Sequence, residues 1–148
     1  MKCPFCNNKT EVYNSRRSHQ ATQTWRRRRC LTCNKSFTTR EKVDFNGIVQ
    51  VKNGDSREPY SRERLLLSIV RASDKLNLPL HMLLELTDSV ELELKNHQFF
   101  EKNTQKVTMI SEVTMTLLAR YNRNLALQYL HNVYKNQPPI ELVKQIVT

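Results

Sequence analysis

Four cysteines, arranged as two C-x2-C pairs, constrain the fold of this chain more than any other feature. The pairs are Cys3 with Cys6 and Cys30 with Cys33, and 23 residues separate them. Zinc is bound tetrahedrally by four thiolates on two tight turns, and this spacing supplies both turns. Two disulfides or a redox-active pair are the alternatives, but no apolar signal segment precedes the first pair and cytosolic thiols stay reduced. The sequence therefore predicts one structural Zn²⁺ per chain.

Positive charge is concentrated in the same part of the chain. Residues 1–45 carry eleven Lys and Arg against three acids, a net charge of +8, whereas residues 46–148 carry thirteen against eleven. A merely solvated surface is the usual explanation for a single run of charge. The asymmetry between the two parts instead favours a polyanionic partner for the first, most simply nucleic acid.

Four consecutive arginines lead directly into the second cysteine pair: Arg26, Arg27, Arg28 and Arg29. On a strand, Arg26 and Arg28 would face one side, and the other two arginines would share the opposite side with Trp25. A guanidinium group donates two parallel hydrogen bonds to phosphates and to guanine edges. We therefore expect the run to bind duplex DNA, together with Arg16 and Arg17. Part of the run could instead offset the negative charge of a four-thiolate zinc site.

Short strands are predicted for the rest of the N-terminal region, at residues 10–16, 24–29 and 35–39. The first two segments could be antiparallel neighbours. A unit of this size cannot bury enough surface to fold alone, so metal binding must supply much of its stability. We place the end of this first domain, a small β zinc ribbon, at residue 45.

The only two glycines of the chain mark the beginning of a second domain. Each glycine follows an asparagine, at Asn46-Gly47 and at Asn53-Gly54. Asn-Gly is a strong hairpin signal, because both residues tolerate positive φ. The second pair predicts a turn that joins a strand at 48–52 to residues 55–60. We expect this domain to span residues 46–138 and to be followed by a C-terminal tail or short helix at 139–148.

Helical periodicity follows Pro59. Helices are expected from Ser61, over about 80–97, from Thr108, and over about 124–136, where Pro138-Pro139 should end the last one. Their inward faces are expected to hold mainly branched apolar residues: Leu65, Leu66, Ile69, Val70 and Leu76; Leu83, Leu84, Val90 and Leu94; Ile110, Val113, Leu117, Leu118 and Tyr121; Leu127, Leu130, Val133 and Tyr134. The predicted fold class is α+β, with a β zinc ribbon followed by a mainly helical domain.

Several motifs resemble the NrdR family of bacterial ribonucleotide-reductase regulators: CPFC at 3–6, NSR at 14–16, RRRRCLTCNKSFTTRE at 26–41 and REPYSRERL at 57–65. The resemblance implies a zinc ribbon joined to an ATP-cone, a helical nucleotide-binding domain with a short β-hairpin. It also implies a repressor that binds duplex DNA upstream of ribonucleotide-reductase genes. In that family, ATP and dATP are effectors, and homo-oligomer formation couples nucleotide binding to DNA binding.

The same resemblance implies a set of nucleotide-binding residues: Val49, Val51, Lys52, Arg57, Glu58, Arg64 and Tyr134. The family hairpin usually reads V-x-K-x-x-G, but here Gly54 follows Lys52 by only two residues. The last cone helix has Leu127 and Tyr129 where the family has tyrosine and arginine. These departures bear on nucleotide binding and selectivity. Without the resemblance, the cations would be taken as ordinary surface charge, since neither a Walker A loop nor a G-x-G-x-x-G motif is present.

An enzyme is not expected, because no catalytic constellation is visible and zinc would use all four cysteines. The alternative reading is a ribbon protein that binds RNA or the transcription machinery, with a degenerate cone as an interaction module. No apolar run approaches the length of about 18 residues that a membrane span needs. We therefore expect a cytoplasmic protein without a membrane partner.

Overall fold

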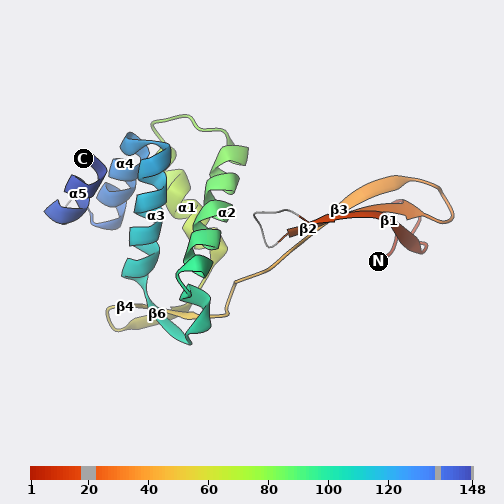
Figure 1. The fold of residues 1–148 in the computed structure, drawn as a ribbon, viewed down its shortest axis with the longest axis horizontal. Coiled ribbons are helices and arrows are strands. Elements are labelled where there is room, and N and C mark those ends of the chain that lie inside the picture. Colours follow the sequence, from red (N-terminus) through yellow and green to blue (C-terminus); the bar gives the residue numbers. More distant parts are fainter. Residues whose placement is uncertain (18–22, 136–137, 148) are drawn as a thin grey trace. The chain divides into compact units, whose positions relative to one another are not determined.

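The computed structural model describes residues 1–17, 23–135 and 138–147, which belong to two compact units, Met1–Asp44 and Phe45–Thr148 (Figure 1). The division falls one residue earlier than the sequence suggested. The reason is that Phe45 belongs to the core of the second unit, where its ring stacks on that of Phe100 at a centroid distance of 4.1 Å. The first unit is a β-sheet and the second is mainly helical, so the predicted α+β class is confirmed.

The first unit is built on a three-stranded antiparallel sheet of β1 (Thr10–Arg17), β2 (Gln23–Cys30) and β3 (Ser36–Lys42), with β2 in the centre. All three predicted strands are present, and the third extends to Lys42. Within the described part of this unit, Cys3 and Cys30 are the only hydrophobic residues that are fully buried. The sheet thus has almost no apolar core of its own, as expected for a unit that depends on a metal.

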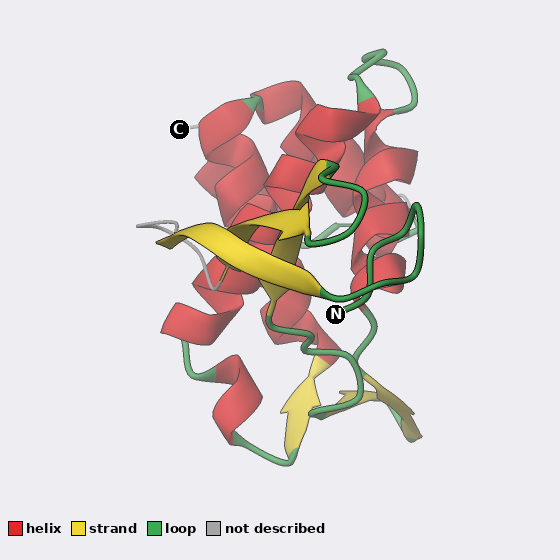
Figure 2. Ribbon diagram, turned by 90° about the vertical axis from the view of Figure 1, so that its right-hand side faces the viewer, coloured by secondary structure: helices red, strands yellow, loops and turns green. Residues whose placement is uncertain are grey.

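The second unit contains a small sheet of β5 (Ser56–Pro59), β4 (Gln50–Asn53) and β6 (Thr104–Lys106), which lies at one end of the helices (Figures 1 and 2). The predicted hairpin is present. Its turn was predicted one residue too early: Asn53 pairs with Ser56, so the two-residue loop is Gly54 and Asp55 instead of Asn53 and Gly54, and of these residues only Gly54 adopts a positive φ, of +59°. β6 pairs in parallel with β4 and was not predicted, because its three polar residues carry no strand pattern.

Helices form the rest of this unit: α1 (Arg62–Ser73), α2 (Leu80–Asn96), a 3-10 turn η1 (Phe99–Glu101), α3 (Val107–Tyr121), α4 (Arg123–Val133) and α5 (Ile140–Val147). Ser61 caps α1 as predicted, since its hydroxyl accepts a hydrogen bond from the N–H of Arg64 over 3.3 Å. The predicted cap at Thr108 is wrong, because β6 runs directly into α3. The predicted end of the fourth helix, residue 136, lies outside the described residues. Among the described helices, none has the length and apolar character needed to cross a membrane.

Most predicted inward residues contribute to the core, and the exceptions show where a helix face was misplaced. Leu84, Tyr121 and Val133 are exposed by 37%, 43% and 37%. On α4 the fully buried residues are Leu125, Ala126, Tyr129 and Leu130, whereas Leu127 and Tyr134 are only partly buried. The true inward face of α4 is therefore rotated from the predicted one. Its burial is set by packing against α1 and α3, which the local sequence does not contain.

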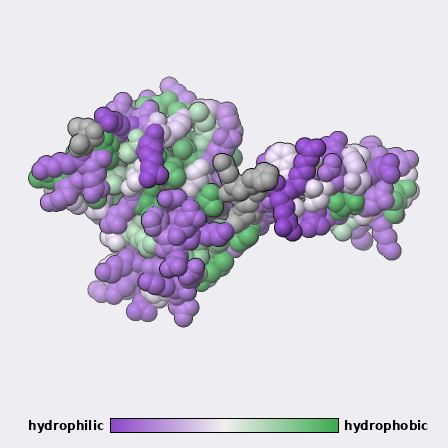
Figure 3. Space-filling model, viewed as in Figure 1, coloured by the Kyte–Doolittle hydropathy of each residue, from purple (hydrophilic) through white to green (hydrophobic). Residues whose placement is uncertain are grey.

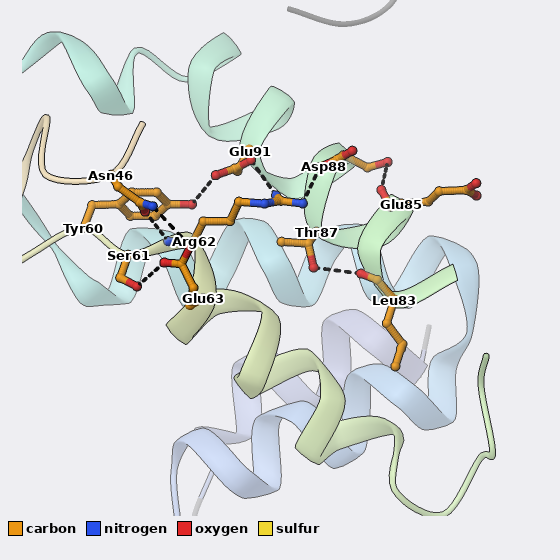
Figure 4. A network of polar contacts seen from close by, with 11 residues as sticks. Asn46, Tyr60, Ser61, Arg62, Glu63, Leu83, Glu85, Thr87, Asp88 and Glu91 are labelled. Carbon is orange, nitrogen blue, oxygen red and sulfur yellow. Dashed lines mark hydrogen bonds and ion pairs between the residues drawn. The ribbon is translucent and has the colours of Figure 1, made fainter. Parts of the chain in front are cut away.

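A buried ionic network ties the beginning of α1 to the middle of α2 (Figure 4). The Arg62 guanidinium lies 2.7 Å from the carboxylate of Glu91 and 2.6 Å from that of Asp88. Glu91 is only 3% exposed and also accepts a hydrogen bond from the Tyr60 hydroxyl over 3.1 Å. Burial, reinforced by the nearby Glu91 carboxylate, raises the pKa of Tyr60. Arg62 therefore supplies the cation that a buried carboxylate needs.

Replacing Arg62 should destabilise the second unit strongly. We expect Arg62→Ala to lower its free energy of unfolding by about 3–5 kcal/mol, because the buried Glu91 carboxylate would lose its ion pair with Arg62. The control is Arg71→Ala, an exposed arginine in the last turn of the same helix, which should cost about 0.5 kcal/mol or less. Adding Glu91→Gln to Arg62→Ala should recover part of the loss. Denaturant unfolding followed by helical circular dichroism measures all three, and a loss below about 1 kcal/mol for Arg62→Ala would contradict this role.

Candidate functional site

The four cysteine sulfurs of the first unit converge on one point. All four lie within 4.8 Å of one another, with 3.7 Å between Cys3 and Cys33 and 3.4 Å between Cys6 and Cys30. Four sulfurs at about 2.3 Å from a central zinc ion lie about 3.8 Å apart, so the cluster has the size of a tetrahedral zinc site. The structure holds all four as free cysteines, in agreement with metal ligands and not with two disulfides.

The two cysteine-bearing turns have the same construction. In each, an asparagine follows the second cysteine and adopts a left-handed conformation, with φ of 59° at Asn7 and 57° at Asn34. Asparagine tolerates this conformation better than most residues. Cys3 N–H donates to the Asn8 carbonyl over 2.8 Å, and Cys30 N–H donates to the Lys35 carbonyl over 3.0 Å. The repeated C-x-x-C-N pattern was visible in the sequence and could have identified these asparagines.

Backbone N–H groups also support negative charge on the sulfurs. The N–H groups of Cys33 and Thr32 each donate to the Cys30 sulfur over 3.4 Å, and they lower the pKa of the Cys30 thiol to about 6. The N–H of Phe5 donates to the Cys3 sulfur over 3.5 Å. The Lys35 N–H lowers the pKa of the Cys33 thiol, but burial and hydrogen bonds with the other three thiols outweigh it and raise that pKa to about 12. Thiolates are the form that binds zinc, so Cys30 is the ligand that the turn itself favours in that form.

The arginine run lies on the central strand β2, and its side chains alternate as predicted. Arg27 and Arg29 are exposed together with Trp25, whereas Arg26 and Arg28 are half-buried. Opposed residues of paired strands share a face, so the register extends the two sets across the sheet. We call them the Arg27 face (Glu11, Tyr13, Asn14, Arg16, Trp25, Arg27, Arg29, Ser36, Thr38 and Arg40) and the Arg28 face (Val12, Ser15, Arg17, Thr24, Arg26, Arg28, Phe37, Thr39 and Glu41). The visible surface of the ribbon is mostly hydrophilic (Figure 3).

A cavity of about 270 Å³ lies in the second unit, between the hairpin and helices α1, α3 and α4. Val51 and Glu58, an opposed pair of the hairpin, line it together with Arg64, whose guanidinium pairs with Glu58. Its other lining residues include the hydroxyl-bearing Ser61, Ser68, Ser111 and Tyr129. Burial raises the pKa of Tyr129, whose hydroxyl lies near Ser68, Ser111 and Thr114.

The structure does not bring four of the expected nucleotide residues to this cavity. Lys52 and Arg57 are an opposed pair of the hairpin, one position from Val51 and Glu58, so they face the other side of the small sheet. Val49 is 1% exposed within the core, and Tyr134 packs against the outside of that core. Sequence reasoning also missed lining residues that the cavity contains, notably Tyr129 and the serines of α1 and α3. Their only sequence signal was polar residues at inward helical positions.

Known proteins match this chain over both of its units. The description "Transcriptional repressor NrdR-like, N-terminal domain" matches residues 1–41, which include all four cysteines and the arginine run. A transcriptional repressor NrdR of Finegoldia magna is 35% identical over 124 residues, covering 83% of this chain and 81% of that protein. One from a Thermoanaerobacter species is 34% identical over 132 residues, covering 83% and 84%.

A further relative, the transcriptional repressor NrdR of Symbiobacterium thermophilum, is 36% identical over 96 residues. That match covers 65% of this chain and 64% of the relative, slightly less than two thirds of its length. These relatives are named as transcriptional repressors and not as enzymes, which agrees with the expectation from the sequence.

The zinc site makes a prediction that a single tryptophan allows to be tested. Trp25, the only tryptophan of the chain, lies in the ribbon, and the helices lie in the second unit. We expect freshly purified, reduced protein to contain one Zn²⁺ per chain. Chelation, or Cys33→Ser, should change the Trp25 emission while the helical circular dichroism at 222 nm is retained, because metal binding folds only the ribbon. Absence of stoichiometric zinc by elemental analysis would contradict the site.

Proposed function

The chain belongs to the family of the transcriptional repressor NrdR, and from this premise we propose that it is a zinc-dependent, nucleotide-responsive repressor of transcription. Its target would be duplex DNA upstream of ribonucleotide-reductase genes, in the cytoplasm where bacterial DNA lies. ATP and dATP would control its homo-oligomeric state and through it the affinity for DNA. The observation that carries the proposal is the match to named repressors across both units, combined with the four clustered cysteines.

The ribbon supports the DNA-binding part of this proposal. It carries the large excess of positive charge on a metal-supported sheet with little core, and its arginines lie on the central strand. Ion pairs at the surface leave most of this charge available: Arg26 pairs with Glu41 and Arg29 with Glu11, each over 3.0 Å, and all four side chains are at least 37% exposed. Exposed pairs of this kind are weak, so phosphates can replace the carboxylates.

The cavity of the second unit supports the nucleotide part. Its volume of about 270 Å³ is slightly below that of typical small-molecule sites, which start at about 300 Å³. That space suits a nucleoside, with phosphates extending to the rim. Arg64 is the only lysine or arginine among the cavity residues, and Glu58 beside it could accept hydrogen bonds from a ribose or a base. By linkage, a nucleotide changes DNA affinity only if it binds the DNA-competent assembly more tightly than the other assemblies.

One experiment distinguishes the proposal from the alternative, a ribbon that binds RNA or the transcription machinery. Binding of the zinc-loaded chain to duplex DNA and to RNA of the same sequence is compared, with and without ATP and dATP. The proposed function requires a preference for duplex DNA that the nucleotides change. A preference for RNA, or binding that no nucleotide affects, would favour the alternative.

Removing the arginine run should weaken DNA binding without removing the zinc. We expect replacement of all four arginines, Arg26 to Arg29, by glutamine to weaken binding to every duplex and to reduce its salt dependence, because phosphate contacts release counterions. The matched control removes four exposed cations of the second unit: Arg71, Lys75, Lys95 and Lys102. Fluorescence anisotropy over a range of salt concentrations measures both. Undiminished binding by the zinc-loaded quadruple variant would show that the run serves only to balance the thiolates.

Nucleotide binding should depend on the residues that face the cavity and not on those on the opposite side of the hairpin. We expect Arg64→Gln to weaken ATP and dATP binding by about tenfold or more, because a hydrogen bond to a charged group is removed. Arg57→Gln removes the same charge from the opposite side and should change the affinity by about twofold at most. Isothermal titration calorimetry gives the affinities, and sedimentation velocity gives the oligomers formed with each nucleotide. Equal effects of the two variants would place the phosphates outside the cavity.

A further inference from the structure

A β-bulge in the ribbon brings two neighbouring residues of β1 to the same side of the sheet. The register of β1 against β2 shifts between Val12 and Asn14, so Tyr13 has no partner in the ladder. Tyr13 and Asn14 then line one surface hollow of about 370 Å³ together with Arg27, although consecutive strand residues ordinarily face opposite sides. Bulges of this kind re-aim a side chain at the expense of strand pairing. The product of this bulge is a polar cluster on the Arg27 face.

Hydrogen bonds hold Arg27 in place without neutralising it. Its Nε donates to the Tyr13 hydroxyl over 3.0 Å and its Nη1 donates to the Thr38 hydroxyl over 3.1 Å. The Arg27 guanidinium beside it lowers the pKa of Tyr13. No carboxylate pairs with Arg27 in the described part of the chain. Since arginine has five N–H donors, a fixed, charged group remains with three donors free for a ligand.

The Arg28 face is arranged differently, because its arginines Arg26 and Arg28 are half-buried on the ribbon. Arg28 lies between the opposed residues Val12 and Phe37, and its Nε donates to the Thr39 hydroxyl over 3.2 Å. Arg26 pairs with Glu41, and its Nε is buried. Half-buried arginine stems packed on a sheet are typical of residues that support it. Among the described residues, each face has one arginine in an ion pair, Arg26 with Glu41 and Arg29 with Glu11, so the exposure of the arginines separates the two faces, whereas charge and pairing do not.

From these contrasts we infer that the Arg27 face is the surface that enters the DNA major groove, with Tyr13 and Asn14 contacting base edges beside Arg27. The inference rests on the proposed DNA-binding function. The major groove admits a β-ribbon, and asparagine and arginine are the side chains that recognise adenine and guanine there. Asn14 and Arg27 are directly opposed, which places them about 5 Å apart. Arg16, Arg29 and Arg40, on the same face, are placed to contact phosphates.

The exposed aromatic rings of this face would also suit stacking on unpaired bases, but guanidinium groups already lie over them. The Arg40 guanidinium lies 4.6 Å from the centroid of the Trp25 ring, and that of Arg29 lies 6.0 Å from the centroid of the Tyr13 ring. Single-strand binders need free ring faces as stacking platforms. Rings that orient arginines instead favour a duplex, in which the arginines make the contacts.

The test compares two double variants of the full-length, zinc-loaded protein that remove the same charge from the same strand. The probe is the duplex most enriched by the wild-type protein from a random 30-base-pair pool. R27Q/R29Q should bind it about tenfold more weakly or worse, and the salt slope should fall by about one for each phosphate that the variant no longer binds. R26Q/R28Q should remain within about threefold of wild type. Equal weakening by the two variants, or greater weakening by R26Q/R28Q, would overturn the inference while leaving the proposed function intact.

Further variants keep the test decisive if R27Q/R29Q does not retain zinc. R27K/R29K retains the positive charge but loses the planar guanidinium with its paired N–H donors. The salt dependence of binding should therefore stay unchanged, while discrimination among base pairs falls. Asn14→Ala should relax specificity at one position of the selected duplex, and Ser15→Ala, its neighbour on the opposite face, should not. Unchanged specificity in both R27K/R29K and Asn14→Ala would refute base contact. Tighter binding to the single strand than to the duplex would assign the face to unpaired bases, and failure of the wild type to enrich any duplex would overturn the proposed function as well.

Discussion

Convergence of four thiolates on one metal position is the constraint on which the first unit depends. Its described part buries hardly any apolar side chain apart from two of the cysteines, whereas the described residues of the second unit include a cluster of eighteen buried ones. A sheet without a core cannot offset the entropy of ordering its strands, so the metal must contribute that free energy. The arginines of β2 are held as an ordered surface only as long as the cluster holds the strand that ends at Cys30.

The two units therefore rely on different interactions for their proposed functions: electrostatic attraction in the ribbon and ligand burial in the second unit. The ribbon offers fixed positive charge on a metal-supported strand, where alternation separates exposed arginines from arginines that support the sheet. The second unit offers a cavity between a hairpin and a helical core, and its ionic network of Arg62, Asp88 and Glu91 fixes the helices next to that hairpin. Regulation would require nucleotide binding in the second unit to change the assembly that presents the ribbons.

Features of the fold were predictable from the sequence where residues close together in the chain determine them. The cysteine pairs, the three ribbon strands, the Asn-Gly hairpin and the Ser61 cap belong to this class. Features that depend on contacts with residues far away in the sequence were not predictable. The inward face of α4 is chosen by the helices around it, β6 exists only through pairing with β4, and the orientation of Lys52 depends on a register that one residue reverses. The bulge at Tyr13 likewise arises from pairing with β2, so no periodicity could indicate it.

The dependence of the ribbon on its metal site is tested most directly by amide hydrogen exchange, followed by mass spectrometry, with zinc bound and after chelation. We predict that peptides covering β2, residues 23–30, are protected with zinc and exchange at the rate of an unfolded chain without it. Peptides covering α1 to α4 should keep their protection in both states, because their core is independent of the metal. Protection of β2 that persists without zinc, or helices that become unprotected when zinc is removed, would contradict this dependence.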